Sequence, residues 1–270
     1  MELFLPLEKQ ELIIACQRIS FVFTSVLNVL SLYCILTKTA ANQSGVRAYL
    51  LFIQILIVLT SVHNDVLFCS IPAFPAIAGF CLGWLCMIGL PPHSLEGVFI
   101  FLMALTCVAI MSCTLYRHQS IIPDTNPLRV SKSPYNISWI AGCGPFYIHR
   151  RTTGLLFAIY MSKTYLFIFT AVVLLLFWHM LFVLKNATNQ SPSSVNIVRQ
   201  SLIVLFIQIE VPLIMMMTPG CLLMTSIACE CIPCKVTLPA YAALVLHPLS
   251  HNIILLTATP GYRRFIFRTL

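Results

Sequence analysis

The chain has 270 residues, of which 59% are hydrophobic and only 9% are charged, and its mean hydropathy is +0.92. A soluble domain carries about 25% charged residues, so this composition excludes a soluble globular protein. The net charge of +8 comes from basic residues dispersed over the polar segments without interleaved aromatic residues, which argues against a nucleic-acid partner. Membrane lipid is the partner that the composition predicts.

Seven apolar blocks run through the chain. A helix needs roughly 20 apolar residues to cross a hydrocarbon core of about 30 Å, and backbone polar groups buried in lipid must be paired within the helix. The sequence therefore predicts an all-α membrane protein with one transmembrane domain over residues 1–270 and a seven-helix bundle. The blocks are residues 12–36, 49–68, 71–90, 98–116, 154–184, 201–228 and 238–256.

Two topologies compete, because either block 71–90 or the weaker segment 135–148 completes seven crossings. With block 71–90 crossing, the short-loop Lys and Arg residues divide seven inside and seven outside. With segment 135–148 crossing, Arg117, Arg129 and Lys132 move inside and the division becomes ten to four. Basic residues in short loops favour the cytoplasm, so we expect the second topology, with the N-terminus outside and the C-terminus inside.

Block 71–90 is then an apolar outer loop, partly buried against the bundle, that leads into the third helix. Only Cys69 and Ser70 separate it from the preceding block, and its prolines and glycines weaken a helix. The expected helices are residues 12–36, 49–69, 95–116, 135–149, 154–184, 201–228 and 238–258. The fourth is weak, because segment 135–148 covers only about 21 Å at 1.5 Å per residue.

Several segments, in this order and spacing, resemble the nematode serpentine chemoreceptors, most closely class I, with class H as a near neighbour. The resemblance covers about the first 120 and the last 100 residues. It is carried by YCILTKT at 33–39, YLLFIQI at 49–55, PAFPAIAGFCLG at 72–83, YRHQ at 116–119, WHMLFVL at 178–184, RQSLIVLFIQIEVPLIMMMTP at 199–219 and HNIILLTATPGYRRFIF at 251–267.

The resemblance implies a seven-transmembrane G-protein-coupled receptor for an environmental small molecule, placed in the plasma membrane of sensory cilia on chemosensory neurons. The inner ends of its helices would contact a heterotrimeric G protein. Compared with the family, residues 121–153 are short for a complete fourth helix and second outer loop. The residues that position and resemblance assign to the G-protein contact are Arg117, His118, Lys185, Arg199, Arg263 and Arg264.

Charged residues inside a bilayer are costly and tend to pair with one another. Arg18 and Asp65 lie at similar depths near the outer ends of neighbouring helices, so we expect either a pair or two side chains that reach the surface separately. Lys163 and Glu210 lie nearer to mid-depth, where either a bridge joins them or Lys163 marks the membrane boundary. Pro212 and Pro219 predict a hinge in the sixth helix.

His247 and His251 are spaced i, i+4 and share a helix face, which suits either bundle hydrogen bonding or, less well, a metal. Bundle hydrogen bonding is the reading we adopt, and we expect no metal and no cofactor. Outer cysteines form two groups, and an oxidising compartment favours a disulfide between them over a zinc site. The groups are Cys69, Cys81 and Cys86, and Cys229, Cys231 and Cys234.

No catalytic motif is present, so the sequence predicts a receptor and not an enzyme. Two alternatives remain. One is a truncated receptor relic that does not signal, because of the short segment 121–153. The other is a small-solute transporter or channel, which would require polar residues along one continuous path through the membrane.

Overall fold

The computed structural model describes residues 7–39, 44–72, 79–123, 126, 153–186, 192–229 and 232–269. The chain divides into two compact units, one of Met1–Ile110 with Val204–Leu270 and one of Met111–Ile203. Helices dominate both. They are α1 (Leu7–Lys38), α2 (Ser44–Val62) continued by the π-helix η2 (His63–Phe68), α3 (Trp84–Met87), α4 (Pro92–Ile121), α5 (Thr153–Lys185), α6 (Pro192–Cys229), α7 (Cys234–Val245), α8 (His247–Ala258) and α9 (Pro260–Thr269).

Five described helices are long and apolar enough to cross a membrane, and α7 with α8 makes a sixth span if the bent pair counts as one. The five are Glu11–Lys38, Gly45–Phe68, Pro92–Ile121, Lys163–Lys185 and Val198–Ser226. Their surfaces carry many exposed large apolar side chains, as lipid-facing surfaces do. The predicted all-α membrane fold is confirmed, and the expected fourth helix, residues 135–149, lies outside the described residues.

The predicted seventh helix is broken in the structure. It was expected to run over residues 238–258, but α7 ends at Val245 and α8 begins at His247, with a bend of 49° between them. The cause is Pro248, which has no N–H to offer the carbonyl of Leu244 and whose ring clashes with the preceding turn. The break places Leu246 and His247 at a corner in the middle of the span.

The described part of the predicted outer loop after the second helix forms a small hairpin. Strand β1 (Ser70–Pro72) pairs antiparallel with β2 (Gly79–Cys81), and Ser70 is opposite Cys81. Short helix α3 follows, with Trp84 60% exposed and Met87 79% exposed. Tryptophan and apolar neighbours at a helix end are typical of the membrane interface, and no helix of this segment qualifies as a span among the described residues.

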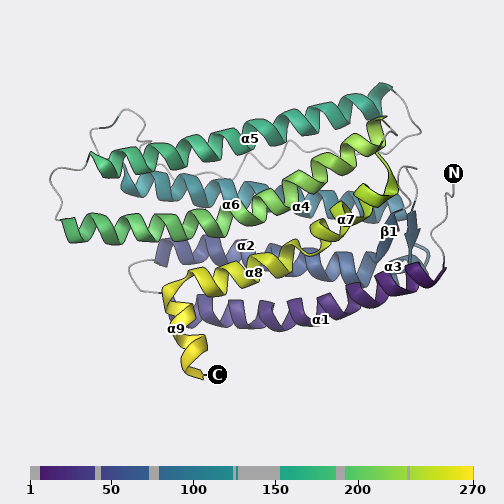
Figure 1. The fold of residues 1–270 in the computed structure, drawn as a ribbon, viewed down its shortest axis with the longest axis horizontal. Helices are drawn as coiled ribbons and strands as arrows, with labels where there is room; N and C mark the ends of the chain where they lie inside the picture. The colour runs from purple at the N-terminus through teal and green to yellow at the C-terminus, as the bar shows by residue number, and fades with distance from the viewer. Residues whose placement is uncertain are drawn as a thin grey trace. The chain divides into compact units, whose positions relative to one another are not determined.

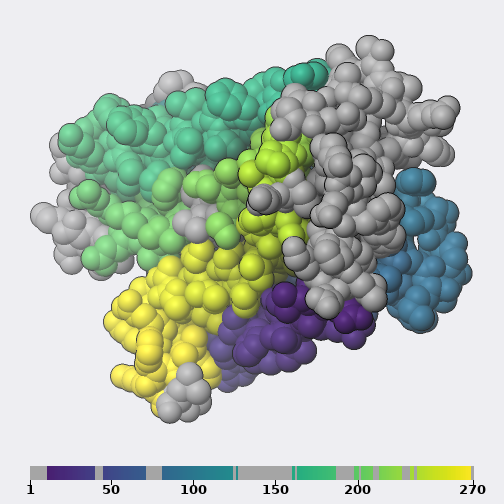
Figure 2. Space-filling model, turned by 45° about the vertical axis from the view of Figure 1, so that its right-hand side comes forward, coloured from purple at the N-terminus to yellow at the C-terminus, as the bar shows by residue number. Residues whose placement is uncertain are grey.

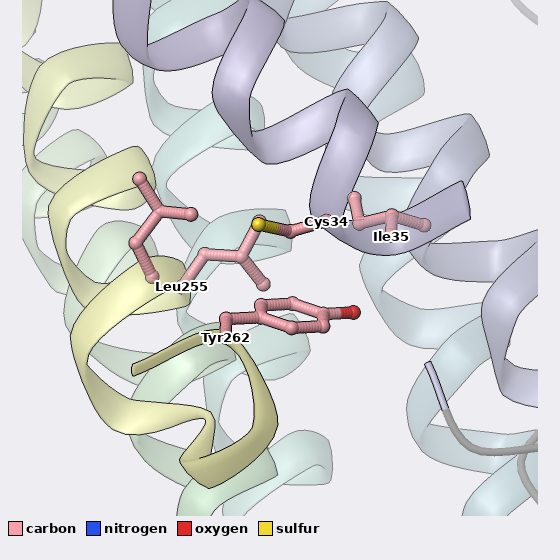
Figure 3. Packing of buried hydrophobic residues seen from close by; sticks show 5 residues of the cluster. Cys34, Ile35, Leu255 and Tyr262 are labelled. Carbon is pink, nitrogen blue, oxygen red and sulfur yellow. The ribbon is translucent and has the colours of Figure 1, made fainter. Parts of the chain in front are cut away.

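In the first unit, α1, α2 and α8 lie side by side (Figure 1). On the face drawn in Figure 2, the yellow surface of α8 and α9 adjoins the purple surface of α1. A core cluster joins these helices where α8 turns into α9. The Tyr262 ring lies against Leu255 and Cys34 (Figure 3), and Ile35 and Leu256 complete the cluster.

The second unit has its own core. Met180 and Leu184 of α5 pack against Leu202 of α6, and Ile121 at the end of α4 packs against this cluster. The carboxyl-terminal ends of α4 and α5 therefore meet the amino-terminal part of α6. This contact orients α4 and α5 in the same direction, a point that bears on the topology of the chain.

Candidate functional site

A narrow hollow in the first unit is lined by both polar and apolar side chains. It is so constricted that it has room for roughly one water molecule. Residues of α2 and η2 form one wall, α4 a second, and the α7–α8 corner a third. The lining residues are Thr60, Ser61, Asn64, Asp65, Phe99, Met103, Leu244, Val245, His247 and Pro248.

The wall formed by η2 is irregular because the helix widens there before it ends. Cys69 N–H donates to the carbonyl of Asn64 at 2.9 Å, five residues back, and Cys69 itself has a left-handed φ of 41°. A π turn re-aims the side chains that follow it and is frequent at functional sites. Gly83, the residue before α3, approaches so closely that an added Cβ would collide with the backbone of Leu67 and Phe68.

Asp65 is held by neutral amides. Its Oδ1 accepts a hydrogen bond from Gln17 Nε2 at 3.2 Å and another from Asn64 Nδ2 at 3.0 Å. The sequence left open whether Asp65 pairs with Arg18 or the two side chains reach the surface separately, and the residue that reaches Asp65 is Gln17, the neighbour of Arg18. Gln17 is buried and Arg18 is exposed, since consecutive helical residues face about 100° apart.

Cys69 lies beside this group. Its Sγ is 3.9 Å from Gln17 Oε1. Burial raises the pKa of the Cys69 thiol, the charge of Asp65 raises it further, and the charge of Arg18 lowers it. The charges of Arg18 and Asp65 thus shift the pKa of the same thiol in opposite directions. The two side chains do not form an ion pair with each other in the described part of the chain.

His247 and His251 are both buried, at 3% and 7% exposure, on the first turns of α8. His247 lines the hollow. His63 of η2 does not line the hollow, and its Nε2 lies 2.9 Å from the carbonyl of Leu95, which ties η2 to α4. In the described part of the chain, no three His, Cys, Asp or Glu side chains converge on a point that could hold a metal ion.

Further along the same helices, three buried amides form a network that the sequence analysis did not identify. Gln54 Nε2 donates to Asn28 Oδ1 and to Asn252 Oδ1, both at 2.9 Å. Asn252 Nδ2 donates to Asn28 Oδ1 at 2.7 Å and to the carbonyl of Pro248 at 2.9 Å. The available signal was the occurrence of Asn and Gln within apolar blocks, where an amide needs a partner on another helix.

In the second unit, His118 lies in the interior. It is 3% exposed, and its Nε2 is 3.0 Å from Nδ1 of His179 on α5. The predicted contact between His118 and a G protein is therefore blocked in this state. Arg117 is half-buried, and its Nε is buried without a hydrogen-bond partner in the described part of the structure. The remaining predicted contacts are exposed, namely Lys185, Arg199, Arg263 and Arg264.

The other predicted residues are only partly described. Lys163 lies over the Tyr160 ring at 5.6 Å from its centroid, while the side chains of Glu210 and Pro212 lie outside the described residues. Helix α6 continues through Pro212 and Pro219 without a break. A disulfide joins Cys81 and Cys86, so two members of the first outer group pair with each other and Cys69 stays a free thiol. The side chains of Cys229, Cys231 and Cys234 lie outside the described residues.

These features define a polytopic helical membrane protein with a polar hollow where one of its spans is broken. Residues 6–145 and, in a second segment, residues 130–266 match the family described as serpentine type 7TM GPCR chemoreceptor Sri. The chain belongs to this family of seven-transmembrane G-protein-coupled chemoreceptors. No curated protein matches the chain significantly. The family is one of receptors and not of enzymes, and the resemblance to class I serpentine receptors is confirmed.

Proposed function

We propose that this chain is a chemosensory receptor that binds an environmental small molecule in the hollow beside Asp65 and signals through a heterotrimeric G protein. The observation that carries the proposal is the place of the hollow. Its walls include Leu244, Val245, His247 and Pro248, which are the residues of the α7–α8 break. A ligand that enlarges the hollow by displacing this wall moves the corner.

The corner is a suitable element for a switch. In this structure the hollow has room for about one water molecule. In the proposed ligand-bound state the hollow is wider, because the wall formed by the α7–α8 corner has moved. A ligand that binds the wider state better shifts the population toward that state. Because α8 leads directly into α9, movement at His247 is transmitted toward Arg263 and Arg264.

The proposed G-protein contact consists of cationic side chains near helix ends, and each unit contributes its own. Arg117, Lys185 and Arg199 belong to the second unit, and Arg263 and Arg264 to α9 in the first. The proposal places these residues in the cytoplasm and the N-terminus outside, in agreement with the ten-to-four division of basic residues. The receptor would then act in the plasma membrane of the sensory cilia.

The test is expression in cultured cells with a G-protein reporter and a panel of small molecules. We expect a response to at least one compound, and loss of that response in Arg117→Ala without loss of surface expression. Arg268→Ala, which removes an exposed cation from the last turn of α9, is the matched control and should respond normally. Surface-expressed receptor that activates no G protein would support the relic, and solute flux into liposomes without G protein would support the transporter.

A further inference from the structure

We propose that the hollow binds a small organic amine, whose ammonium group meets the carboxylate of Asp65. This inference rests on the proposed function, because it takes the hollow to be the ligand site. It adds the chemical class of the ligand, which neither the fold nor the family specifies. Two carboxylates, Asp65 and Glu96, and the composition of the walls support this ligand class.

Asp65 has one carboxylate oxygen in use and one available. Both of its hydrogen-bond donors, Gln17 and Asn64, are neutral amides and both bond to Oδ1. Oδ2 has no hydrogen bond within the described part of the chain, and Asp65 lines the hollow. A carboxylate in such a place is costly without a cation beside it. An ammonium ligand supplies that cation.

A second carboxylate adds to the negative field. Glu96 lies on α4 three residues before Phe99 and seven before Met103, so it shares their face one turn nearer the hairpin. The charges of Glu96 and Asp65 both act on the Tyr241 hydroxyl, which donates to the carbonyl of Ser70 at 2.8 Å. Glu96 does not itself line the hollow, but a carboxylate in the wall and a second one on the same face of α4 as Phe99 and Met103 attract cations and repel anions.

The rest of the lining fits a short amine. Ser61 is 2% exposed, lines the hollow, and its Oγ has no hydrogen-bond partner in the described structure, so it can accept from an N–H of the ligand. The lining contains no lysine or arginine that would neutralise Asp65. Four of the lining side chains are large and apolar: Phe99, Met103, Leu244 and Val245.

The apolar share of the wall also decides between an organic and an inorganic cation. A calcium ion takes six to eight oxygen ligands, and a magnesium ion requires near-octahedral oxygen geometry. Two side-chain oxygens from Asp65 and one each from Thr60, Ser61 and Asn64 make five, which is fewer than calcium takes. An ammonium group needs only a carboxylate and one or two acceptors, and its carbon skeleton packs against the apolar side chains.

The test uses the purified full-length receptor in lipid nanodiscs and a thermal-unfolding readout that is independent of signalling. The probes are butylamine and cyclohexylamine, each compared at neutral pH with the alcohol and the carboxylate of the same carbon skeleton. We expect at least one amine to raise the unfolding temperature in a saturable manner, and the alcohols and carboxylates to do so less. Equal stabilisation by a matched alcohol, or none by either amine, would overturn the proposal.

Variants then locate the cation. Asp65→Asn keeps an oxygen acceptor for Gln17 and Asn64 but removes the charge, and we expect the half-saturating amine concentration to rise about tenfold or more. Glu96→Gln should raise it by a smaller factor. Glu11→Gln, which neutralises an exposed carboxylate of α1 away from the hollow, should leave it unchanged. An unchanged affinity in Asp65→Asn would exclude Asp65 as the ammonium partner.

The two proposals fail in different ways. Amine binding without any G-protein response would overturn the signalling function and leave the ligand chemistry standing. A G-protein response to an uncharged compound that persists in Asp65→Asn would overturn the amine inference and leave the receptor function standing. If Asp65→Asn does not fold, the comparison of amine with matched alcohol on the natural receptor still decides the question.

Discussion

Asn28, Gln54 and Asn252 are almost completely buried, at 5%, 0% and 0% exposure, and each comes from a different helix. In hydrocarbon no water is present to bond an amide that lacks a protein partner. The three residues therefore constrain how α1, α2 and α8 align. Gln54 uses both of its amide hydrogens in the network. Asn252 also bonds to the carbonyl of Pro248, which links the network to the α7–α8 corner.

Removing Asn252 tests the strength of this network. Asn252→Ala leaves one amide hydrogen of Gln54 unpaired, which costs about 1–3 kcal/mol in a buried site, while interhelical hydrogen bonds in membranes average about 0.6 kcal/mol. We expect a loss near 1 kcal/mol and an unfolding temperature lower by about 2–4 °C. Thr257→Ala on the same helix, where the hydroxyl is exposed, is the control. Equal effects of the two substitutions would show that the network adds no stability.

At the scale of the element, α9 is attached to the bundle chiefly through Tyr262. Its ring is 2% exposed within the core cluster (Figure 3), and its hydroxyl is 2.6 Å from Oγ1 of Thr39, which the figure does not show. Burial raises the pKa of Tyr262, and the hydrogen bond to Thr39 partly offsets this shift. Lys38 Nζ lies 4.5 Å from the centroid of Phe265, a second link between α1 and α9.

Two substitutions separate the hydroxyl of Tyr262 from its ring. Tyr262→Phe removes the bond to Thr39 and should cost about 1 kcal/mol, whereas Tyr262→Ala also leaves a cavity and should cost about 3–5 kcal/mol. Thermal unfolding in nanodiscs measures both. Phe267→Ala is the control, since Phe267 is 77% exposed and its loss should change stability by less than about 0.5 kcal/mol. A cost for Tyr262→Ala as small as that of the control would contradict the anchoring role.

The pH dependence of this anchor follows from the raised pKa. The unfolded chain releases the Tyr262 proton first, because its hydroxyl has the ordinary tyrosine pKa. The stability that the neutral hydroxyl contributes is therefore complete at neutral pH and is lost as the pH rises above that ordinary value. In Tyr262→Phe this alkaline decline should be smaller.

Apolar blocks and loop charges predict the class of fold, the positions of most spans and the outer segment after the second helix. They do not predict the break at Leu246, because a proline in a long apolar block either kinks the helix or is accommodated, and packing decides which. The π turn at η2 is invisible for a similar reason. It depends on the segment after the hairpin, which packs against its end through Gly83. The charge of Arg18 suggested it as the partner of Asp65, whereas the neutral Gln17 donates the hydrogen bond to Asp65.

At the scale of the whole molecule, the directions of α4 and α5 bear on the number of crossings. His118 and Ile121 at the end of α4 contact His179, Met180 and Leu184 near the end of α5. The two helices therefore run in the same direction. The start of α5 is therefore a helix length away from the end of α4, and α5, at 33 residues and 1.5 Å per residue, is about 50 Å long. That length exceeds the hydrocarbon core of about 30 Å.

We therefore predict that the chain crosses the membrane between Ile122 and Thr152, although these residues include the short segment 135–148. Epitope tags inserted after Lys132 and after Arg151 test the crossing in intact cells. We expect antibody to reach the second tag and not the first, and a tag after Leu270 to be inaccessible, as the ten-to-four division of basic residues requires. Equal accessibility of the first two tags would contradict the crossing.

The same segment should insert poorly by itself. As a helix, residues 135–148 cover only about 21 Å, which is short of the hydrocarbon core of about 30 Å. Each Å of this mismatch costs a fraction of a kcal/mol. Gly142, Gly144 and Pro145 lower its helix propensity further. An isolated cassette of residues 133–151 should therefore insert into microsomes less efficiently than one of residues 98–116. Equal insertion would mean that the fourth span is complete in itself and that the short segment 121–153 gives no reason to regard the receptor as a relic.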